Sequence, residues 1–262
     1  MELSKKIALV TGAGQGIGKA VAVALAKEGA LVAANDRDLA MAKDTAAEIR
    51  AGGQIAMAVQ ADVSDSEQVR SMVDQVVEKW GGIDILVNNA GAIQSVMVED
   101  LAKKDWDRVI DINLGGVFNC SKAVIPAMKS RGAGRIINIA SLAAKTMSYV
   151  GGADYTASKA GVLGFTRHLA FELGPYRITV NAVCPGLVMT PLTTHRFTPE
   201  KKEAVKLRTP LRDFVTTEDV AAAVVFLASE KARMITGTSL DVDGGISLGA
   251  QDWEAYVQTR KP

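Results

Sequence analysis

The sequence predicts an α/β fold in which seven parallel strands form one doubly wound sheet. Three observations predict it: short apolar runs alternate with longer segments of helical periodicity, the runs are apolar at nearly every position, and glycines follow the first run. Such strands are buried on both faces, as in parallel sheets whose right-handed crossovers are helices. We therefore expect a single Rossmann-like domain over residues 1–262.

The apolar runs give the strands in chain order. They are Ile7–Val10, Leu31–Ala34, Ile55–Val59, Ile83–Val87, Ile136–Ile139, Ile178–Val183 and Ser239–Val242. The segments between them are predicted to be helical, with one long helix over Asp105–Met128 and another over Tyr155–Leu173.

Two capping patterns mark helix starts. Ser64 followed by Glu67 has the spacing of a capping box, and Thr198 followed by Pro199 places proline at a first helical position. Residues 186–216 form one long connection, which we expect to be a substrate-binding loop. Residues 246–262 form a C-terminal extension, in which Trp253 and Tyr256 could pack on a neighbouring subunit.

Composition and charge exclude several classes of protein. The 30 basic and 29 acidic residues give a net charge of +1, without the basic surplus of a nucleic-acid binder. The longest uncharged stretch that we find, residues 178–194, contains Asn181 and Pro185, so it does not predict a membrane span. The N-terminus has no signal-peptide pattern, and we expect a cytoplasmic location. Cys120 and Cys184 lack metal-ligand spacing and are expected to be reduced and structural, with no metal site.

A glycine-rich turn follows the first strand and opens a helix that reaches Lys27. Its pattern, TGxxxGxG, runs from Thr11 to Gly18 and differs from the strict GxGxxG fingerprint because Ile17 takes the last glycine position counted from Gly12. Glycines at a strand-to-helix turn let the backbone approach a pyrophosphate, which the helix N-terminus favours. The alternative is a glycine turn with no ligand. The coenzyme-binding residues predicted here are Gly12, Gln15, Gly16, Ile17 and Gly18.

Asp36 closes the second strand, 18 residues after Gly18. This matches the spacing of the acidic residue that accepts hydrogen bonds from the adenosine ribose, and a carboxylate there repels a 2′-phosphate. Arg37 could bind that phosphate, but Gln15 supplies no second positive charge, so NAD is favoured over NADP. The alternative for Asp36 is an ordinary turn residue after a strand.

Tyr155 and Lys159 are four residues apart at the start of a predicted helix and share one face. A tyrosine with a pKa near 10 becomes a useful base only if its pKa falls by ~2–3 units, worth ~3–4 kcal/mol. A cation about 4 Å away at an effective dielectric of ~20 supplies roughly that energy. The alternative is an exposed polar pair.

Together with TGxxxGxG, this pair resembles the short-chain dehydrogenase/reductase family, and the resemblance covers nearly the whole chain. Further matches in the same order are Asn88-Asn89-Ala90-Gly91, Asn113, Ser141, Pro185-Gly186 and Val242-Asp243-Gly244-Gly245. The resemblance implies a catalytic tetrad of Asn113, Ser141, Tyr155 and Lys159. In the family the serine polarises the carbonyl or hydroxyl, the tyrosine transfers the proton, the lysine lowers the tyrosine pKa and holds the nicotinamide ribose, and the asparagine supports a water relay.

The resemblance also extends the coenzyme site. Asp62 would face the adenine, and Val188 and Thr190 would fix the nicotinamide carboxamide. The remaining implied coenzyme residues are Val63, Asn89, Ala90, Gly91, Pro185 and Gly186, together with Tyr155 and Lys159. Milder alternatives exist, since Asn113, Ser141 and Asp62 could each serve only a local turn or cap.

Two departures from the family pattern concern the substrate side. Ser141 and Tyr155 are 14 residues apart, one more than the family leads us to expect, and the extra residue lies within Lys145–Asp154. The C-terminal extension is the second departure. His168 is predicted to be an ordinary helix residue, and His195 a loop residue that could touch substrate.

These inferences lead to an NAD(H)-dependent oxidoreductase that moves a hydride between nicotinamide and a secondary alcohol or ketone. An alternative substrate is a 3-oxoacyl thioester, and an alternative of another class is a catalytically silent member acting as a binding subunit.

The resemblance and the apolar helices favour a homotetramer. Six basic residues against three acidic ones between Thr193 and Asp213 indicate either attraction of an anionic substrate or a solvated face.

Overall fold

The computed structural model describes residues 1–190, 193–194, 197–249 and 253–260. Its seven strands form one sheet in the order β3-β2-β1-β4-β5-β6-β7, and every neighbouring pair is parallel. This confirms the predicted doubly wound, Rossmann-like fold. The strands are β1 Ile7–Val10, β2 Leu31–Asp36, β3 Ala56–Gln60, β4 Ile85–Asn88, β5 Gly134–Ile139, β6 Ile178–Pro185 and β7 Ser239–Val242.

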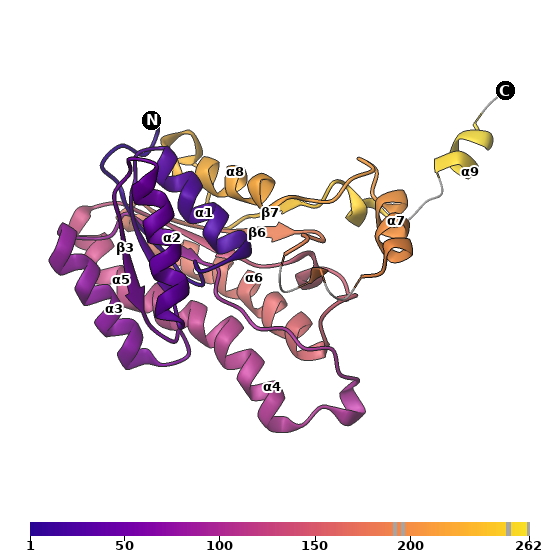
Figure 1. Ribbon diagram of the computed structural model, residues 1–262, viewed down its shortest axis with the longest axis horizontal. Coiled ribbons are helices and arrows are strands. Elements are labelled where there is room, and N and C mark those ends of the chain that lie inside the picture. Colours follow the sequence, from indigo (N-terminus) through magenta and orange to yellow (C-terminus); the bar gives the residue numbers. More distant parts are fainter. Residues whose placement is uncertain (191–192, 195–196, 250–252, 261–262) are drawn as a thin grey trace.

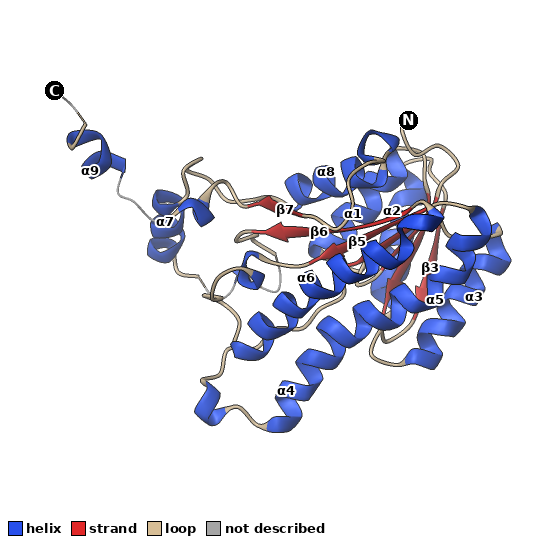
Figure 2. Cartoon of the chain, turned by 180° about the vertical axis from the view of Figure 1, so that it is seen from behind, coloured by secondary structure: helices blue, strands red, loops and turns tan. Residues whose placement is uncertain are grey.

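Helices cover both faces of the sheet (Figures 1 and 2). They are α1 Gly16–Lys27, α2 Leu39–Ala51, α3 Ser66–Trp80, α4 Lys103–Ile110, α5 Gly116–Arg131, α6 Ala153–Leu173, α7 Pro199–Arg208, α8 Thr217–Ala228 and α9 Trp253–Gln258. Helices α1, α2 and α8 share one apolar cluster with the sheet, and α3, α5 and α6 share the other. Each crossover helix thus buries its apolar stripe against one side of the strands.

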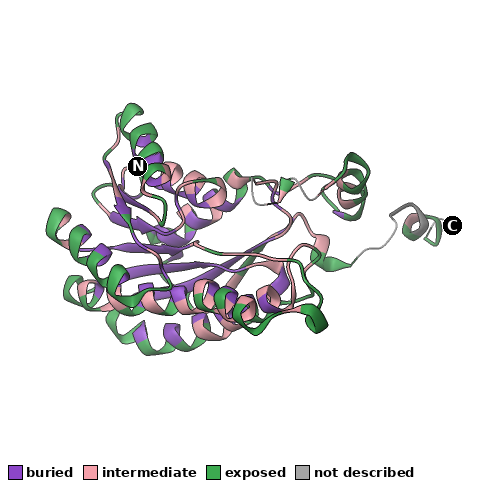
Figure 3. Ribbon diagram, turned by 60° about the horizontal axis from the view of Figure 1, so that its bottom comes forward, coloured by how far each residue is buried: buried purple, intermediate pink, exposed green. Residues whose placement is uncertain are grey.

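Alternation along β1 shows how the two clusters are separated. Ala8 and Val10 pack in the cluster with α1 and α8, whereas Ile7 and Leu9 pack in the cluster with α3, α5 and α6. All four are buried, which is why this strand is apolar at every position. Figure 3 shows the strands as the buried centre of the molecule.

The helical segment expected over Asp105–Met128 is present, as α4, a π-helical turn at Asp111–Gly115, and α5 in unbroken succession. One local prediction is wrong. The cap of α3 is Asp65, not Ser64, because the Asp65 carboxylate accepts hydrogen bonds from the backbone N–H groups of Glu67 and Gln68. The Ser64 hydroxyl instead donates to Asp62 at 2.6 Å.

The predicted cap of α7 is confirmed, since the Thr198 side chain accepts from the Lys201 backbone and Pro199 is the first helical residue. This helix lies within the long connection from β6 to α8, which a parallel bridge between Val188 and Val215 anchors at both ends. Cys120 and Cys184 are buried and free. None of the helices in the described part of the chain is long and apolar enough to cross a membrane.

Candidate active site

The motifs found in the sequence meet at one edge of the sheet, where the parallel strands end at their carboxyl termini. Five motifs lie at these carboxyl ends: the turn after β1, the acid at the end of β2, the asparagines after β4, the serine after β5 and the proline-glycine pair after β6. A parallel sheet delivers these groups together because its strands all point the same way.

Glycines and one asparagine build a cradle at the end of β1. A Cβ at Gly18 would lie 2.1 Å from the Gly12 carbonyl oxygen and 2.3 Å from the Asn89 amide nitrogen. The Asn89 amide donates to the carbonyls of Thr11 and Gly12, both at 3.0 Å. Thr11 accepts in turn from the backbone of Asn89 and Ala90 through its hydroxyl. The Gly12 carbonyl and the Asn89 amide therefore leave no room for a larger residue at position 18.

The N-terminus of α1 opens onto this cradle. Its N-cap, Gln15, makes no side-chain cap, so the first N–H groups of the helix keep their capacity to bind an anion. Gly16 has a φ of 55°, a left-handed conformation that glycine adopts at little cost. A Cβ at Gly16 would lie 3.4 Å from the Thr190 methyl carbon, so the loop after β6 closes over the same point.

Asp36 lies beside the glycine turn at the end of β2. Its carboxylate accepts from the Gly14 backbone at 3.1 Å and from the Asp38 backbone at 3.1 Å. A hollow next to it is lined by Arg37, Asp38, Leu39, Ala40, Gln60, Asp62 and Gln68. Asp62 lines this hollow, and its carboxylate accepts from the Ser64 backbone and hydroxyl. Val63 is buried, and a Cβ at Gly116 would lie 2.6 Å from its side chain.

Tyr155 is the third residue of α6 and interacts with Ser141, the residue that follows Ala140 at the end of β5. Burial raises the pKa of Tyr155, and the hydrogen bond with the Ser141 side chain opposes this rise only in part. The expected lowering of the Tyr155 pKa is therefore wrong for the protein alone. The physical reason is that burial penalises the phenolate.

Lys159 is buried one helical turn beyond Tyr155. Its ammonium donates to the Ile139 carbonyl at 2.8 Å and lies 5.7 Å from the centre of the Tyr155 ring. Burial lowers the pKa of Lys159 to about 8. Burial thus disfavours the charged form of both side chains. Tyr155 is a neutral phenol, and Lys159 loses its proton more readily than a free lysine does.

Asn113 occupies the π-helical turn between α4 and α5 and is fully buried. Its amide oxygen accepts from the Ala92 backbone at 2.7 Å, and its amide nitrogen donates to the Ala92 carbonyl and the Ser158 hydroxyl, both at 3.0 Å. A Cβ at Gly91 would lie 3.3 Å from the Asn113 oxygen and 3.8 Å from the Lys159 ammonium. The structure therefore brings these predicted residues together, and π-bulges of this kind occur frequently at functional sites.

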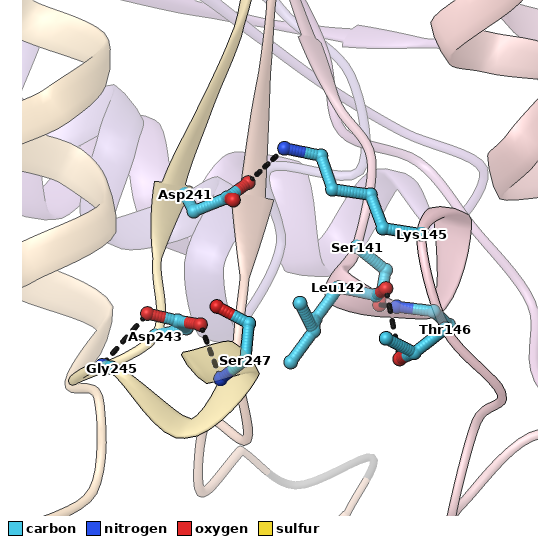
Figure 4. Close-up of polar contacts among 9 residues, drawn as sticks. Ser141, Leu142, Lys145, Thr146, Asp241, Asp243, Gly245 and Ser247 are labelled. Carbon is cyan, nitrogen blue, oxygen red and sulfur yellow. Dashed lines mark hydrogen bonds and ion pairs between the residues drawn. The ribbon is translucent and has the colours of Figure 1, made fainter. Parts of the chain in front are cut away.

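The segment after β6 completes the edge. Pro185 ends the strand, and the Gly186 N–H donates to the Val242 carbonyl at 2.9 Å. Asp243 accepts from the backbone of Gly245 and Ser247, which shapes the turn after β7 (Figure 4). Burial alone would raise the pKa of Asp243, but these hydrogen bonds hold it below its usual value. Val188 is buried at the bridge to Val215, next to Thr190.

An ion pair joins the turn after Ser141 to the edge strand of the sheet. Lys145 and Asp241 approach to 2.6 Å, with about a third of each side chain exposed (Figure 4). Cys184 lies beside them, and burial raises its pKa to about 11, although the Lys145 ammonium partly offsets the rise. A thiol with so high a pKa is a poor nucleophile at neutral pH.

Several residues of this site were not predicted. Gln94 and Asp154 form a hydrogen bond of 2.6 Å across 60 residues of sequence, and Ser158 holds Asn113. An acid directly before Tyr155 in a first helical turn was the available signal for Asp154. His168 is exposed on α6 near Glu172, as an ordinary helix residue. His195 and Arg196 lie outside the described residues.

The basic residues of the long connection are partly engaged. Lys206 pairs with Asp213 at 3.4 Å, and Arg208 donates to the Tyr149 hydroxyl at 3.1 Å. Lys201 and Lys202 lie in the first turns of α7. Among the described residues, no group of three His, Cys, Asp or Glu side chains could hold a metal ion.

Comparisons with known proteins agree with this geometry. Residues 12–247 match the family model described as enoyl-(acyl carrier protein) reductase. The chain is 42% identical to a 3-oxoacyl-[acyl-carrier-protein] reductase of Staphylococcus aureus, over 93% of this chain and 98% of the relative. It is 43% identical to a protein of that name from Synechocystis sp., over 94% and 98% of the two chains. The solved structure of gox2181 superposes with a TM-score of 0.91 at 37% identity, over 95% and 98% of the two chains.

Proposed function

The chain belongs to the short-chain dehydrogenase/reductase family and is an oxidoreductase; from this premise we propose that it interconverts 3-oxoacyl and 3-hydroxyacyl thioesters with NAD(H). The observation that carries the proposal is the convergence of Ser141, a neutral, half-buried Tyr155 and Lys159 beside a glycine cradle. A 3-hydroxyacyl thioester is a secondary alcohol, so this class falls within the broader expectation from sequence. The names of the relatives favour it over other secondary alcohols.

A nicotinamide coenzyme fits the residues of the cradle. Four glycines of this turn, Gly12, Gly14, Gly16 and Gly18, have no side chain that could block a pyrophosphate. The N-terminus of α1 lacks a side-chain cap of its own. Asp36 would accept from the ribose hydroxyls and would face a 2′-phosphate as a like charge, which supports NAD over NADP. Asp62, Val63 and the segment Asn89–Gly91 would line the adenosine and ribose. Val188 and Thr190, with Pro185 and Gly186, would border the nicotinamide.

The reacting residues have distinct tasks in this proposal. The coenzyme supplies the hydride when it is bound. Tyr155 gives a proton to the substrate oxygen, and its raised pKa keeps the phenol protonated at neutral pH, which suits the reduction of a ketone. Ser141 donates a hydrogen bond to the same oxygen. Lys159, held by the Ile139 carbonyl, stabilises the phenolate that remains, and Asn113 orders the backbone at Ala92 beside it.

The test is a turnover comparison with purified protein. We expect reduction of 3-oxoacyl thioesters with NADH to give a kcat/KM at least tenfold above that for simple ketones or for polyols in the reverse direction. Preferred turnover of a polyol or simple secondary alcohol would overturn the substrate class and leave the oxidoreductase site in place. A complete lack of turnover with every substrate and both coenzymes would count against the proposed site itself.

The assembly proposed is a homotetramer, in line with the sequence expectation. Phe118 of α5 is 48% exposed and Phe171 of α6 is 85% exposed, so these helices present apolar side chains to the outside. Light scattering at micromolar concentration is expected to give four times the chain mass. A monomer mass would contradict it.

A further inference from the structure

Asp154 is a fully buried carboxylic acid next to the proposed proton donor, and the mechanism above gives it no task. It is the second residue of α6, directly before Tyr155. Carboxylates are rarely buried without compensating partners. The position at a helix N-terminus, where the peptide dipoles favour negative charge, supplies part of that compensation.

Two hydrogen bonds account for the rest. One carboxylate oxygen accepts from the Tyr155 backbone N–H at 2.8 Å, and the other accepts from the Gln94 amide at 2.6 Å. The Gln94 carbonyl in turn accepts from the Gly152 N–H at 2.7 Å. Asp154 therefore joins the start of α6 to the segment that follows β4, which Asn113 already holds at Ala92.

The two glycines before α6 are shaped by this arrangement. A Cβ at Gly151 would lie 2.8 Å from the Tyr155 ring, and a Cβ at Gly152 would lie 2.8 Å from the Asp154 carboxylate. These glycines lie in the segment that carries one residue more than the family leads us to expect. In this segment the chain is thus packed closely around Tyr155 and Asp154.

We propose that Asp154 is a positioning residue: through the Tyr155 backbone and the Gln94 side chain it fixes the phenol relative to Ser141 and to the substrate oxygen. The inference rests on the proposed function, because it assigns Tyr155 the proton transfer. A misplaced donor slows the chemical step without weakening coenzyme binding, because the cradle at Gly12–Gly18 belongs to other elements.

Kinetics of three variants test this inference. Asp154→Ala is expected to lower kcat at least tenfold while the KM for coenzyme stays within twofold. Asp154→Asn is expected to stay within threefold of the parent, because Asn accepts from Tyr155 and the Gln94 amide can turn to accept from it. Asp65→Ala is the matched control, since it removes a carboxylate from the N-terminus of α3, and its kcat is expected to stay within twofold.

A spectroscopic readout separates positioning from general loss of structure. With 3-fluorotyrosine incorporated, the ¹⁹F resonance of Tyr155, assigned by its absence in Tyr155→Phe, is expected to shift in Asp154→Ala and not in Asp65→Ala. An Asp154→Ala enzyme with parental kcat and an unmoved resonance would overturn the inference. If Asp154→Ala does not fold, Gln94→Met serves as the test. A kcat at least threefold below that of the parent supports the inference, and a kcat equal to that of the parent overturns it.

Failure of the proposed function would look different. Tyr155→Phe with turnover close to the parent removes Tyr155 from the chemistry, whatever Asp154 does. Loss of activity in Tyr155→Phe, together with full activity in Asp154→Ala, rejects only the positioning role.

Discussion

Two loops of the site, residues 11–18 and 145–152, both contain glycines but are fixed by different kinds of contact. In the first, the Gly12 carbonyl and the Asn89 side-chain amide lie so close to Gly18 that no side chain fits. In the second, side chains make the contacts: Lys145 pairs with Asp241, Ser148 accepts from the backbone of Gly151, and Tyr149 meets Arg208. A backbone cradle admits few sequences, whereas side-chain contacts can be exchanged. We therefore expect the first loop to govern coenzyme binding and the second to govern substrate choice.

The largest effect expected from this comparison is that of Gly18→Ala. Its methyl group would overlap the Gly12 carbonyl oxygen, 2.1 Å away, so the backbone must move. We expect a loss of about 3 kcal/mol in the free energy of unfolding, at the upper end of the usual overpacking cost, and much weaker coenzyme binding. Gly174→Ala, where no atom lies within 4 Å of the added Cβ, is the control. Equal melting temperatures for the two variants would contradict the claim that position 18 has no room for a side chain.

Lys159→Met tests how the proposed catalytic lysine affects stability. Burial lowers the pKa of Lys159 to about 8 from 10.5, so the unfolded chain binds this proton more tightly than the folded chain. The free energy of unfolding should therefore rise with pH between about 8 and 10.5. Below pH 8 it should stay lowered, because the buried lysine is then charged. At pH 7 the variant is expected to gain about 2 kcal/mol in the free energy of unfolding, less at pH 10, by chemical denaturation. A less stable variant at pH 7 would contradict this.

Asp36→Ala sharpens the coenzyme side of the comparison. We expect the parent to prefer NAD and the variant to lose about tenfold in the ratio of kcat/KM for NAD over NADP, or about 1.4 kcal/mol. Asp38→Ala removes a neighbouring carboxylate but leaves Asp36 in place, so its ratio should change less than threefold. A parent that prefers NADP, or an unchanged ratio in Asp36→Ala, would refute the assignment.

The smallest effect concerns the connection that carries α7. If Lys201 and Lys202 attract an anionic substrate, kcat/KM should fall roughly two- to fivefold as ionic strength rises from about 0.01 to 0.15 M, where the Debye length shrinks from ~30 to ~8 Å. Replacing both lysines by glutamine should flatten this dependence, and Lys104→Gln on α4 should not. If kcat/KM of the parent does not change with ionic strength, these lysines form only a solvated helical face.

Sequence alone predicts the parts of the site that depend on local spacing. The glycine turn and the pair Tyr155 and Lys159 fall where the pattern places them, because a strand-to-helix turn and a helical face are short-range properties. Contacts between distant segments escape such reasoning, as with Gln94 and Asp154. The direction of the Tyr155 pKa was missed for the same reason: it depends on burial, which the tertiary fold decides. The helix cap at Asp65 was missed because Ser64, one residue earlier, also has the spacing of an N-cap.

The central claim, that Tyr155 transfers the proton while a separate cradle holds the coenzyme, is tested most directly by measuring NAD binding and turnover together in Tyr155→Phe. The variant loses one hydroxyl and keeps every contact of the Gly12–Gly18 turn. The account predicts a dissociation constant for NAD within a few-fold of the parent and turnover reduced by more than a hundredfold. Turnover within tenfold of the parent would contradict it.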